Sequence, residues 1–241
     1  MKKFLAILLC ACMALTLVAC NAEKEYKLGM GVVVSMDSSK TENAQVDATV
    51  ATVVLDADGK IVACRIDVAQ SKMAIADGVV DAAKTFETKM ELGDRYAMAG
   101  KVDNDGNGVM KEWYEQTKAF EAYVVGKTVA EVEAIETKEA NGHLIAVDQA
   151  LLDAGCSMQI TDFIAAVAAA CKDEQGVSFK TAAEFTLGVA AKASAADSVA
   201  ATAEADGTVA MYTDFAAAVV ADGKIIAALN DAIQPKITIN A

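Results

Sequence analysis

Acidic and amide side chains near the middle of the chain have the spacing of the first half of a calcium-binding loop. Oxygen-bearing side chains occupy positions 1, 3 and 5 of that pattern, at Asp103, Asp105 and Asn107, and Gly108 follows at position 6. Tyr114 stands at position 12, where such loops place a bidentate carboxylate. The spacing predicts a calcium site with a reduced ligand set, and an ordinary Asp/Asn/Gly turn is the alternative.

A second stretch suited to chemistry is a turn of small residues before an Ala-rich segment. Gly155, Cys156 and Ser157 form this turn, and a helix is expected from about residue 161 to 171, with Thr161 or Asp162 as its N-cap. Small residues leave backbone N–H groups open to an anion, and a helix N-terminus behind them adds a positive dipole. A turn and helix cap without any ligand is the alternative interpretation.

Imidazole and thiol groups add little to these two candidates. His143 is the only histidine and the sequence contains no C-x-x-C motif, so neither a zinc site nor a thiol redox site is expected. Cys64, Cys156 and Cys171 follow the N-terminal region, and their odd number and wide spacing do not form a disulfide framework. We interpret them as buried apolar residues. No catalytic constellation stands out, which favours a binding or electron-carrier module over a turnover enzyme.

The elements that would position these residues have an α+β pattern. Residues 26–68 contain three β-rich runs joined by polar turns, which is typical of an antiparallel meander. Apolar residues in 110–124 recur at helical spacing, and 128–135 begins with a capping-box pattern. We therefore predict an antiparallel sheet with helices packed on one face.

The third strand of this meander recurs near the end of the chain. The Asp-Gly turn and apolar run of residues 58–70 reappear in residues 222–234 without a gap. The recurrence predicts a complete module in residues 26–175 and a partial repeat in residues 176–241 that contains strands without their helices. A three-stranded sheet with one bare apolar face is marginally stable alone, so the repeat should pack on the first module or self-associate.

The N-terminus has the pattern of an export signal. Lys2 and Lys3 precede an apolar run that is too short to span a membrane comfortably, which predicts a signal peptide over residues 1–19. The run ends in a sequence that resembles a bacterial lipobox, which implies lipidation of Cys20 and a short tether over residues 20–25. An ordinary signal peptide with an incidental cysteine is the alternative. We expect a lipid-anchored protein on the outer face of the cytoplasmic membrane.

The charge of the chain limits its partners. The formal net charge is −13, which argues against binding to nucleic acid because nucleic acid selects basic surfaces. The same charge argues against docking of side chains on anionic lipid, so the acyl group at Cys20 would provide the attachment to the membrane.

The Asp-Gly-Lys hairpin at residues 58–60 and the stretch from residue 153 to 170 together resemble the FMN-binding domain of exported flavoproteins. That family carries a Ser-Gly-Ala-Thr turn before an Ala-rich helix, and its Thr can hold FMN through a phosphoester bond. The resemblance places Gly155, Cys156 and Ser157 on the motif, with Ser157 in place of the Thr, and it implies flavin binding at this turn and at Thr161. Ala154 departs from the motif, which leaves covalent attachment in question and non-covalent binding open.

Several stretches also look like a group of repeat-bearing lipoproteins from anaerobic Gram-positive bacteria, among them residues 84–98 and 111–128. This resemblance supports the location and the repeat architecture. Taken together, the sequence predicts an extracytoplasmic lipoprotein with an FMN-binding-like module for electron transfer at the cell surface, and it names no redox partner. A structural or interaction lipoprotein without a cofactor is the alternative.

Overall fold

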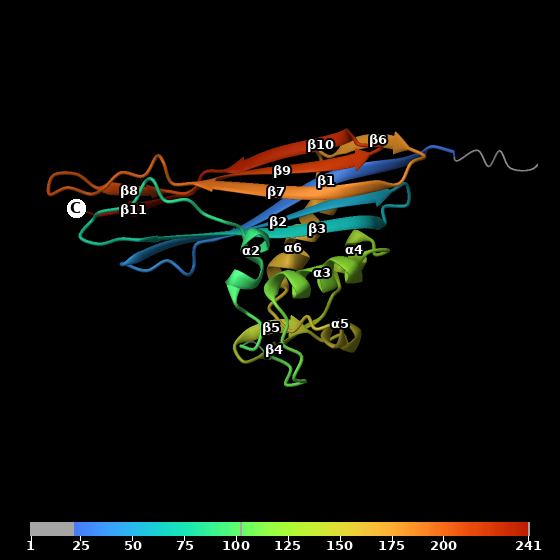
Figure 1. Ribbon diagram of the computed structural model, residues 1–241, viewed down its shortest axis with the longest axis horizontal. Coiled ribbons are helices and arrows are strands. Elements are labelled where there is room, and N and C mark those ends of the chain that lie inside the picture. The colour runs from blue at the N-terminus through green and yellow to red at the C-terminus, as the bar shows by residue number, and fades with distance from the viewer. Residues whose placement is uncertain (1–21, 102, 241) are drawn as a thin grey trace, which may run out of the picture.

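The computed structural model describes residues 22–101 and 103–240. Most of the secondary-structure elements in these residues are β-strands (Figure 1). The strands are β1 (Lys24–Ser35), β2 (Asn43–Asp56), β3 (Ile61–Ala74), β4 (Thr137–Ala140), β5 (His143–Ala146), β6 (Val177–Thr181), β7 (Phe185–Ser194), β8 (Gly207–Ala210), β9 (Tyr212–Ala221), β10 (Lys224–Ile233) and β11 (Lys236–Ile239). The helices are α2 (Lys89–Leu92), η1 (Gly93–Tyr96), α3 (Trp113–Val124), α4 (Val129–Glu133), α5 (Gln149–Asp153) and α6 (Thr161–Lys172). The predicted signal peptide and Cys20 lie outside the described residues.

The predicted fold class is wrong. The described chain is 44% strand and 19% helix, and its strands form four separate antiparallel sheets, so it is a mainly β protein with a few short helices rather than an α+β fold. The physical reason is that the largest sheet is buried on both faces. Along β2, the residues from Ala48 to Leu55 are buried without interruption, so both faces of this strand need cover.

The largest sheet has the strand order β3-β2-β1-β6, and all its neighbours are antiparallel. β2 and β3 form the hairpin expected around Asp58-Gly59. The Asp56 carboxylate accepts hydrogen bonds from the backbone N–H groups of Asp58 and Lys60, and Gly59 has a φ of 73°. Asp56 and Gly59 therefore fix the turn and the register of the two long strands.

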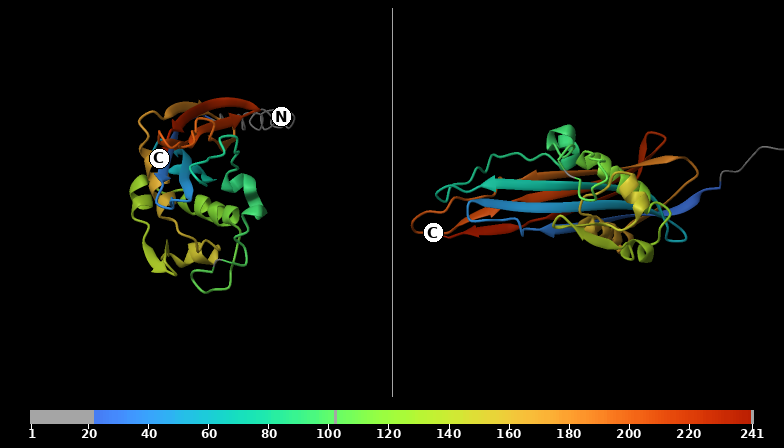
Figure 2. Two further views of the ribbon diagram at one scale, coloured as in Figure 1. Left: turned by 90° about the vertical axis from the view of Figure 1, so that its left-hand side faces the viewer. Right: turned by 90° about the horizontal axis from the view of Figure 1, so that it is seen from below.

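A second sheet with the order β10-β9-β7 covers one face of the first sheet (Figures 1 and 2). Its strands repeat the order β3-β2-β1, and Gly223 has a φ of 71° at the turn that corresponds to Gly59. Apolar side chains from the facing sheets form one core, among them Leu28, Val50, Phe215 and Val219. All regular elements between Val177 and Ile239 are strands. The division of the chain at residue 175 stays a prediction, and β6, which follows it, pairs with β1.

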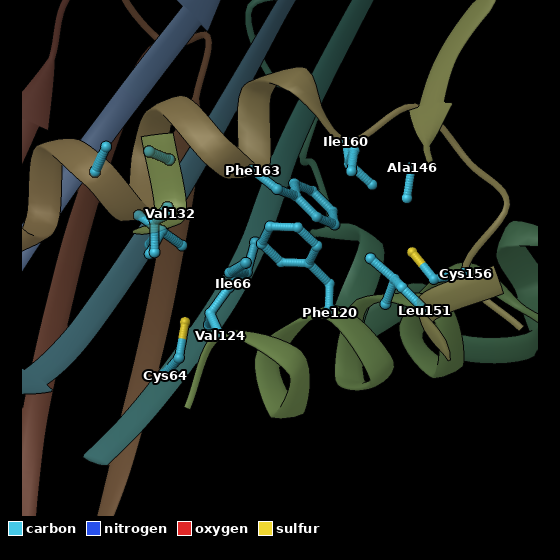
Figure 3. Close-up of a cluster of buried hydrophobic side chains, with 14 of the residues drawn as sticks. Cys64, Ile66, Phe120, Val124, Val132, Ala146, Leu151, Cys156, Ile160 and Phe163 are labelled. Carbon is cyan, nitrogen blue, oxygen red and sulfur yellow. The ribbon is translucent and has the colours of Figure 1, made fainter. Parts of the chain in front are cut away.

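The opposite face of the first sheet packs on α3, α4 and α6 through a second core (Figures 1 and 3). Phe120 and Phe163 meet there with ring centroids 5.5 Å apart. α6 approaches β1 so closely that a Cβ added at Gly31 would lie 2.3 Å from the carbonyl oxygen of Ala166. Glycine at this position therefore lets α6, and the turn before it, sit directly on the sheet.

Candidate functional site

A cavity of about 420 Å³ lies beside the N-terminal end of α6; we call it the α6 cavity. Its walls come from β1, β2, β3, β5, α2, α3, α6 and loops between these elements. The lining residues are Ser35, Ser38, Gln45, Asp47, Thr49, Val68, Gln70, Lys89, Met98, Asn104, Trp113, His143, Met158, Gln159, Asp162 and Phe163. This size is within the range of pockets that bind small molecules and cofactors.

Polar side chains on β2 and β3 form one wall of the cavity. The carboxylate of Asp47 accepts hydrogen bonds of 2.5 Å from Gln45 Nε2 and 2.8 Å from Gln70 Nε2. Two amides thus hold this carboxylate in a fixed orientation. The other acid, Asp162 in the first turn of α6, has a pKa raised above its usual range, mainly by burial and then by the charge of Asp47, while Lys89 lowers it.

Aromatic rings and one cation form another part of the wall. The Trp113 ring meets Phe163 edge-on with centroids 6.0 Å apart, and Tyr96 packs on the Trp113 ring at 6.4 Å. The Lys89 ammonium lies 5.1 Å from the Tyr96 ring centroid and 5.5 Å from that of Trp113. The cavity therefore offers a positive charge beside aromatic surface, together with the carboxylates of Asp47 and Asp162.

The turn of small residues lies next to this cavity but is closed. The backbone N–H groups of Ser157 and Met158 both donate to Oε1 of Gln116 at 3.0 Å. Ser157 is 1% exposed, and its Oγ has no hydrogen-bond partner among the residues that the structure describes. The Cys156 thiol lies in the apolar cluster beside Leu151, and burial raises its pKa to about 12 (Figure 3). No N–H of Ser157 or Met158 is thus free for an incoming anion.

Residues 103–111 lie across this turn, and we call them the strap. Asn104 Nδ2 donates to the carbonyl oxygen of Ser157 at 2.9 Å, and Lys111 Nζ donates to that of Ala154 at 2.8 Å. Gly155 has a φ of 87°, and a Cβ added there would lie 2.7 Å from Lys111 Cδ. The structure therefore brings the predicted calcium loop and the predicted flavin turn together as neighbours.

Thr161 takes a different place from the other predicted ligand residues. It begins α6 and lines a shallow groove with Glu133 and Ile164, outside the α6 cavity. The expected N-cap at Thr161 or Asp162 is wrong, because the N-cap residue of α6 is Ile160, whose side chain makes no cap hydrogen bond.

The predicted calcium loop is folded tightly on itself. Asp103 Oδ2 accepts from the backbone N–H of Gly108 at 3.0 Å, and Asp105 Oδ2 accepts from Asn107 Nδ2 at 2.7 Å. Among the described residues, no group of three or more His, Cys, Asp and Glu side chains gathers at a distance suited to a metal ion. Any cation here would therefore depend on two carboxylates together with amide, carbonyl or water oxygens.

Sequence reasoning missed the residues that form most of the cavity. Asp47, Gln70 and Lys89 come from three separate elements, and no local pattern connects them. Gln116 carried a usable signal, because it is a polar residue on the buried side of α3 and is 0% exposed. A fully buried amide needs partners, and those partners are the N–H groups of the turn.

A chlorophenol reductase of Desulfitobacterium hafniense is 32% identical to this chain over 158 residues, which cover 57% of the chain and 46% of that reductase. The chain thus spans less than half the length of this curated relative. No protein family model matches the chain, and no solved structure matches it. The resemblance to FMN-binding domains therefore rests on the residues of this chain alone. None of the helices in the described residues is long and apolar enough to cross a membrane.

Proposed function

We propose that the protein is an extracytoplasmic, lipid-anchored module that binds a flavin-type redox ligand in the α6 cavity. The observation that carries this proposal is the combination of Lys89 with Trp113 in a cavity of about 420 Å³ beside the N-terminus of α6. An aromatic and cationic wall suits a planar ligand that bears an anionic group. The similarity to a reductase supports a redox role.

Non-covalent binding fits these residues and a phosphoester at Ser157 does not. Ser157 is 1% exposed, and the strap and Gln116 close the turn that contains it. A ligand in the α6 cavity would instead have Lys89 near its anionic group and the amides of Gln45 and Gln70 near its polar edge. A bound flavin would supply one- and two-electron transfer, and this chain would hold and orient it.

We assign the protein a carrier role rather than turnover. The acids in the cavity, Asp47 and Asp162, are held by amides or partly buried. A lipid at Cys20 would keep the carrier at the outer face of the cytoplasmic membrane, where it would exchange electrons with a surface-bound partner.

The test is a calorimetric titration of FMN into the chain from residue 22 onward, purified without added cofactor. We expect a dissociation constant in the micromolar range, and Lys89→Ala should weaken binding at least tenfold. Lys84→Ala is the matched control, because the Lys84 ammonium lies over the Phe86 ring and outside the cavity. Absence of heat at millimolar FMN, or equal effects of the two substitutions, would contradict the proposal.

A second candidate is a structural or interaction lipoprotein without a cofactor. The observation that favours it is Gln116, whose Oε1 occupies the two N–H groups that an anion would need at the turn. Self-association through the strands after residue 176 would suit this role. If the protein is colourless and does not bind FMN, the structural or interaction role is the candidate that remains. Calcium is a separate ligand proposal, at the loop that contains Asp103, Asp105 and Asn107.

A further inference from the structure

We propose that a second cavity, of about 600 Å³, binds an apolar amine whose ammonium group pairs with the carboxylate of Glu121. We call it the edge cavity, because it lies where β3 and β7, which are edge strands of the two large sheets, contact each other (Figure 1). Side chains of α3 and Met90 of α2 form its other walls. The edge cavity shares no lining residue with the α6 cavity, so the two are separate candidate sites.

Most of the wall of the edge cavity is apolar, and its side chains come from both cores of the protein. Ile66 belongs to the core under the helices, and Leu187 belongs to the core between the two sheets. Val62 and Val125 also line the cavity and are 36% and 48% exposed. The size is that of a small-molecule pocket, and a ligand with an apolar body would remove these side chains from water.

The charged groups of this wall indicate the sign of the ligand. Its two acids, Asp67 and Glu121, are buried, whereas its two cations, Arg65 and Lys118, are exposed. The Lys118 ammonium is also engaged, since it lies 5.0 Å from the centroid of the Tyr114 ring. The buried part of the cavity thus carries negative charge on an apolar surface, which favours an apolar ligand with a positive group over one with a negative group.

The Glu121 carboxylate has room for a further donor. Its Oε1 accepts a hydrogen bond of 2.7 Å from the backbone N–H of Ile66, and its Oε2 accepts one of 3.2 Å from Nη1 of Arg65. A carboxylate has about four acceptor sites, so two partners leave it unsaturated. Burial raises the pKa of Glu121 to about 7, although Arg65 and Lys118 lower it. The two exposed cations do not offset the burial, and an ammonium inside the cavity would favour the ionised carboxylate.

Arg65 competes with such a ligand for the same carboxylate. Its side chain is 51% exposed, and its contact with Glu121 is longer than is usual for a charged pair. An arriving ammonium can therefore displace the guanidinium into solvent at little cost. Removal of Arg65 should strengthen the binding of an amine, whereas it would weaken the binding of an anion. The two ligand classes thus predict opposite effects of one substitution.

The experiment is a calorimetric titration of octylammonium chloride into the chain from residue 22 onward, without flavin. We expect a dissociation constant of about 0.1–1 mM, and sodium octanoate, which has an alkyl tail and the opposite charge, should bind at least about tenfold more weakly. Glu121→Gln keeps an oxygen for the Ile66 N–H and should weaken octylammonium binding at least about tenfold. Arg65→Gln should strengthen it about threefold or more. Because Arg65 is exposed, this second variant tests the site even if Glu121→Gln does not fold.

The ion pair of Glu87 with Arg95 supplies the matched controls, since it joins the same residue types, is exposed, and lies outside the edge cavity. Glu87→Gln and Arg95→Gln change the net charge as the test variants do, and each should alter octylammonium binding less than about twofold. The proposal is overturned if octylammonium gives no heat up to 10 mM, if octanoate binds as tightly, if Glu121→Gln leaves the affinity unchanged, or if Arg65→Gln weakens binding. None of these outcomes depends on FMN binding in the α6 cavity.

Discussion

The side-chain oxygen of Gln116 accepts a 3.0 Å hydrogen bond from the backbone N–H of Ser157, although 41 residues separate the two in sequence. The same oxygen accepts from the next N–H, that of Met158. One buried amide on α3 thereby fixes the turn that precedes α6. The shape of this turn, and of the α6 cavity beside it, depends on α3 as much as on the turn's own small residues.

Replacement of Gln116 by leucine should destabilise the protein by about 2–4 kcal/mol. The change leaves two buried N–H groups without an acceptor, and each costs about 1–3 kcal/mol. Urea unfolding followed by circular dichroism measures this difference. Gln149→Leu is the control, because Gln149 is exposed and its side chain bonds to the exposed Asp153, and it should change stability by less than about 0.5 kcal/mol. Similar losses for the two variants would contradict this account of the turn.

Replacement of Gly31 by alanine should destabilise the protein by about 3 kcal/mol. The new Cβ would lie 2.3 Å from Ala166 O and 2.5 Å from Ala170 N, and both are backbone atoms that move only with α6 itself. Gly188→Ala is a matched substitution in β7, where the nearest atom to a new Cβ is 4.0 Å away. The same unfolding assay should find it close to neutral. A neutral Gly31→Ala would show that α6 does not pack on β1 this closely.

Stability should fall as the pH rises from about 4.5 to 7, partly because of Glu121. Burial raises the pKa of this carboxyl to about 7, against the lowering effects of the Ile66 N–H and Arg65. The folded state therefore binds a proton that the unfolded state has released in this range. The contribution is present below pH 4.5, is lost through pH 7, and amounts to about 3 kcal/mol.

Unfolding free energies at pH 4.5 and 8 for the unsubstituted chain and for Glu121→Gln measure this effect. Asp67 and Asp162 also have raised pKa values and remain in both proteins, so the difference between the two pH profiles reports Glu121. The variant should lose less stability over this interval. Parallel profiles would mean that Glu121 is ionised in the folded protein at low pH.

The three thiols after residue 22 should react slowly in the folded protein. Cys64 and Cys156 are buried, and burial raises the pKa of each thiol; that of the half-buried Cys171 is raised to about 11. At pH 8, the rate of reaction with a disulfide reagent should be less than about a tenth of the rate in guanidinium. Rapid reaction of one thiol before unfolding would contradict this burial.

Local turn chemistry made part of the fold predictable. Asp58-Gly59 and Asp222-Gly223 marked the two hairpins, since glycine accepts the positive φ that each turn requires. The apolar spacing in Trp113–Val124 marked α3 in the same way. The fold class was predicted wrongly because the sequence of a three-stranded meander does not by itself indicate what covers the second face of its sheet. The run from Ala48 to Leu55, which is apolar apart from Thr49 and Thr52, was the available signal for burial on both faces.

The candidate site was harder to predict from the sequence than the fold. Gly155, Cys156 and Ser157 form the turn that the sequence indicated, but its closure by Gln116 and Asn104 depends on contacts between distant segments. The α6 cavity joins Lys89 to Trp113 and to strand residues, and no spacing rule predicts such an arrangement. Only the folded sheets bring them together.

The most direct test of the central claim uses Trp113, the only tryptophan in the chain and a residue of the α6 cavity wall. FMN is titrated into the chain from residue 22 onward while the tryptophan fluorescence is followed, with free tryptophan as the reference for light absorbed by the flavin. A ligand in the cavity should quench Trp113 with saturation at micromolar FMN, and Lys89→Ala should shift the curve to higher concentrations. Fluorescence that follows the free-tryptophan reference up to millimolar FMN would contradict flavin binding in this cavity.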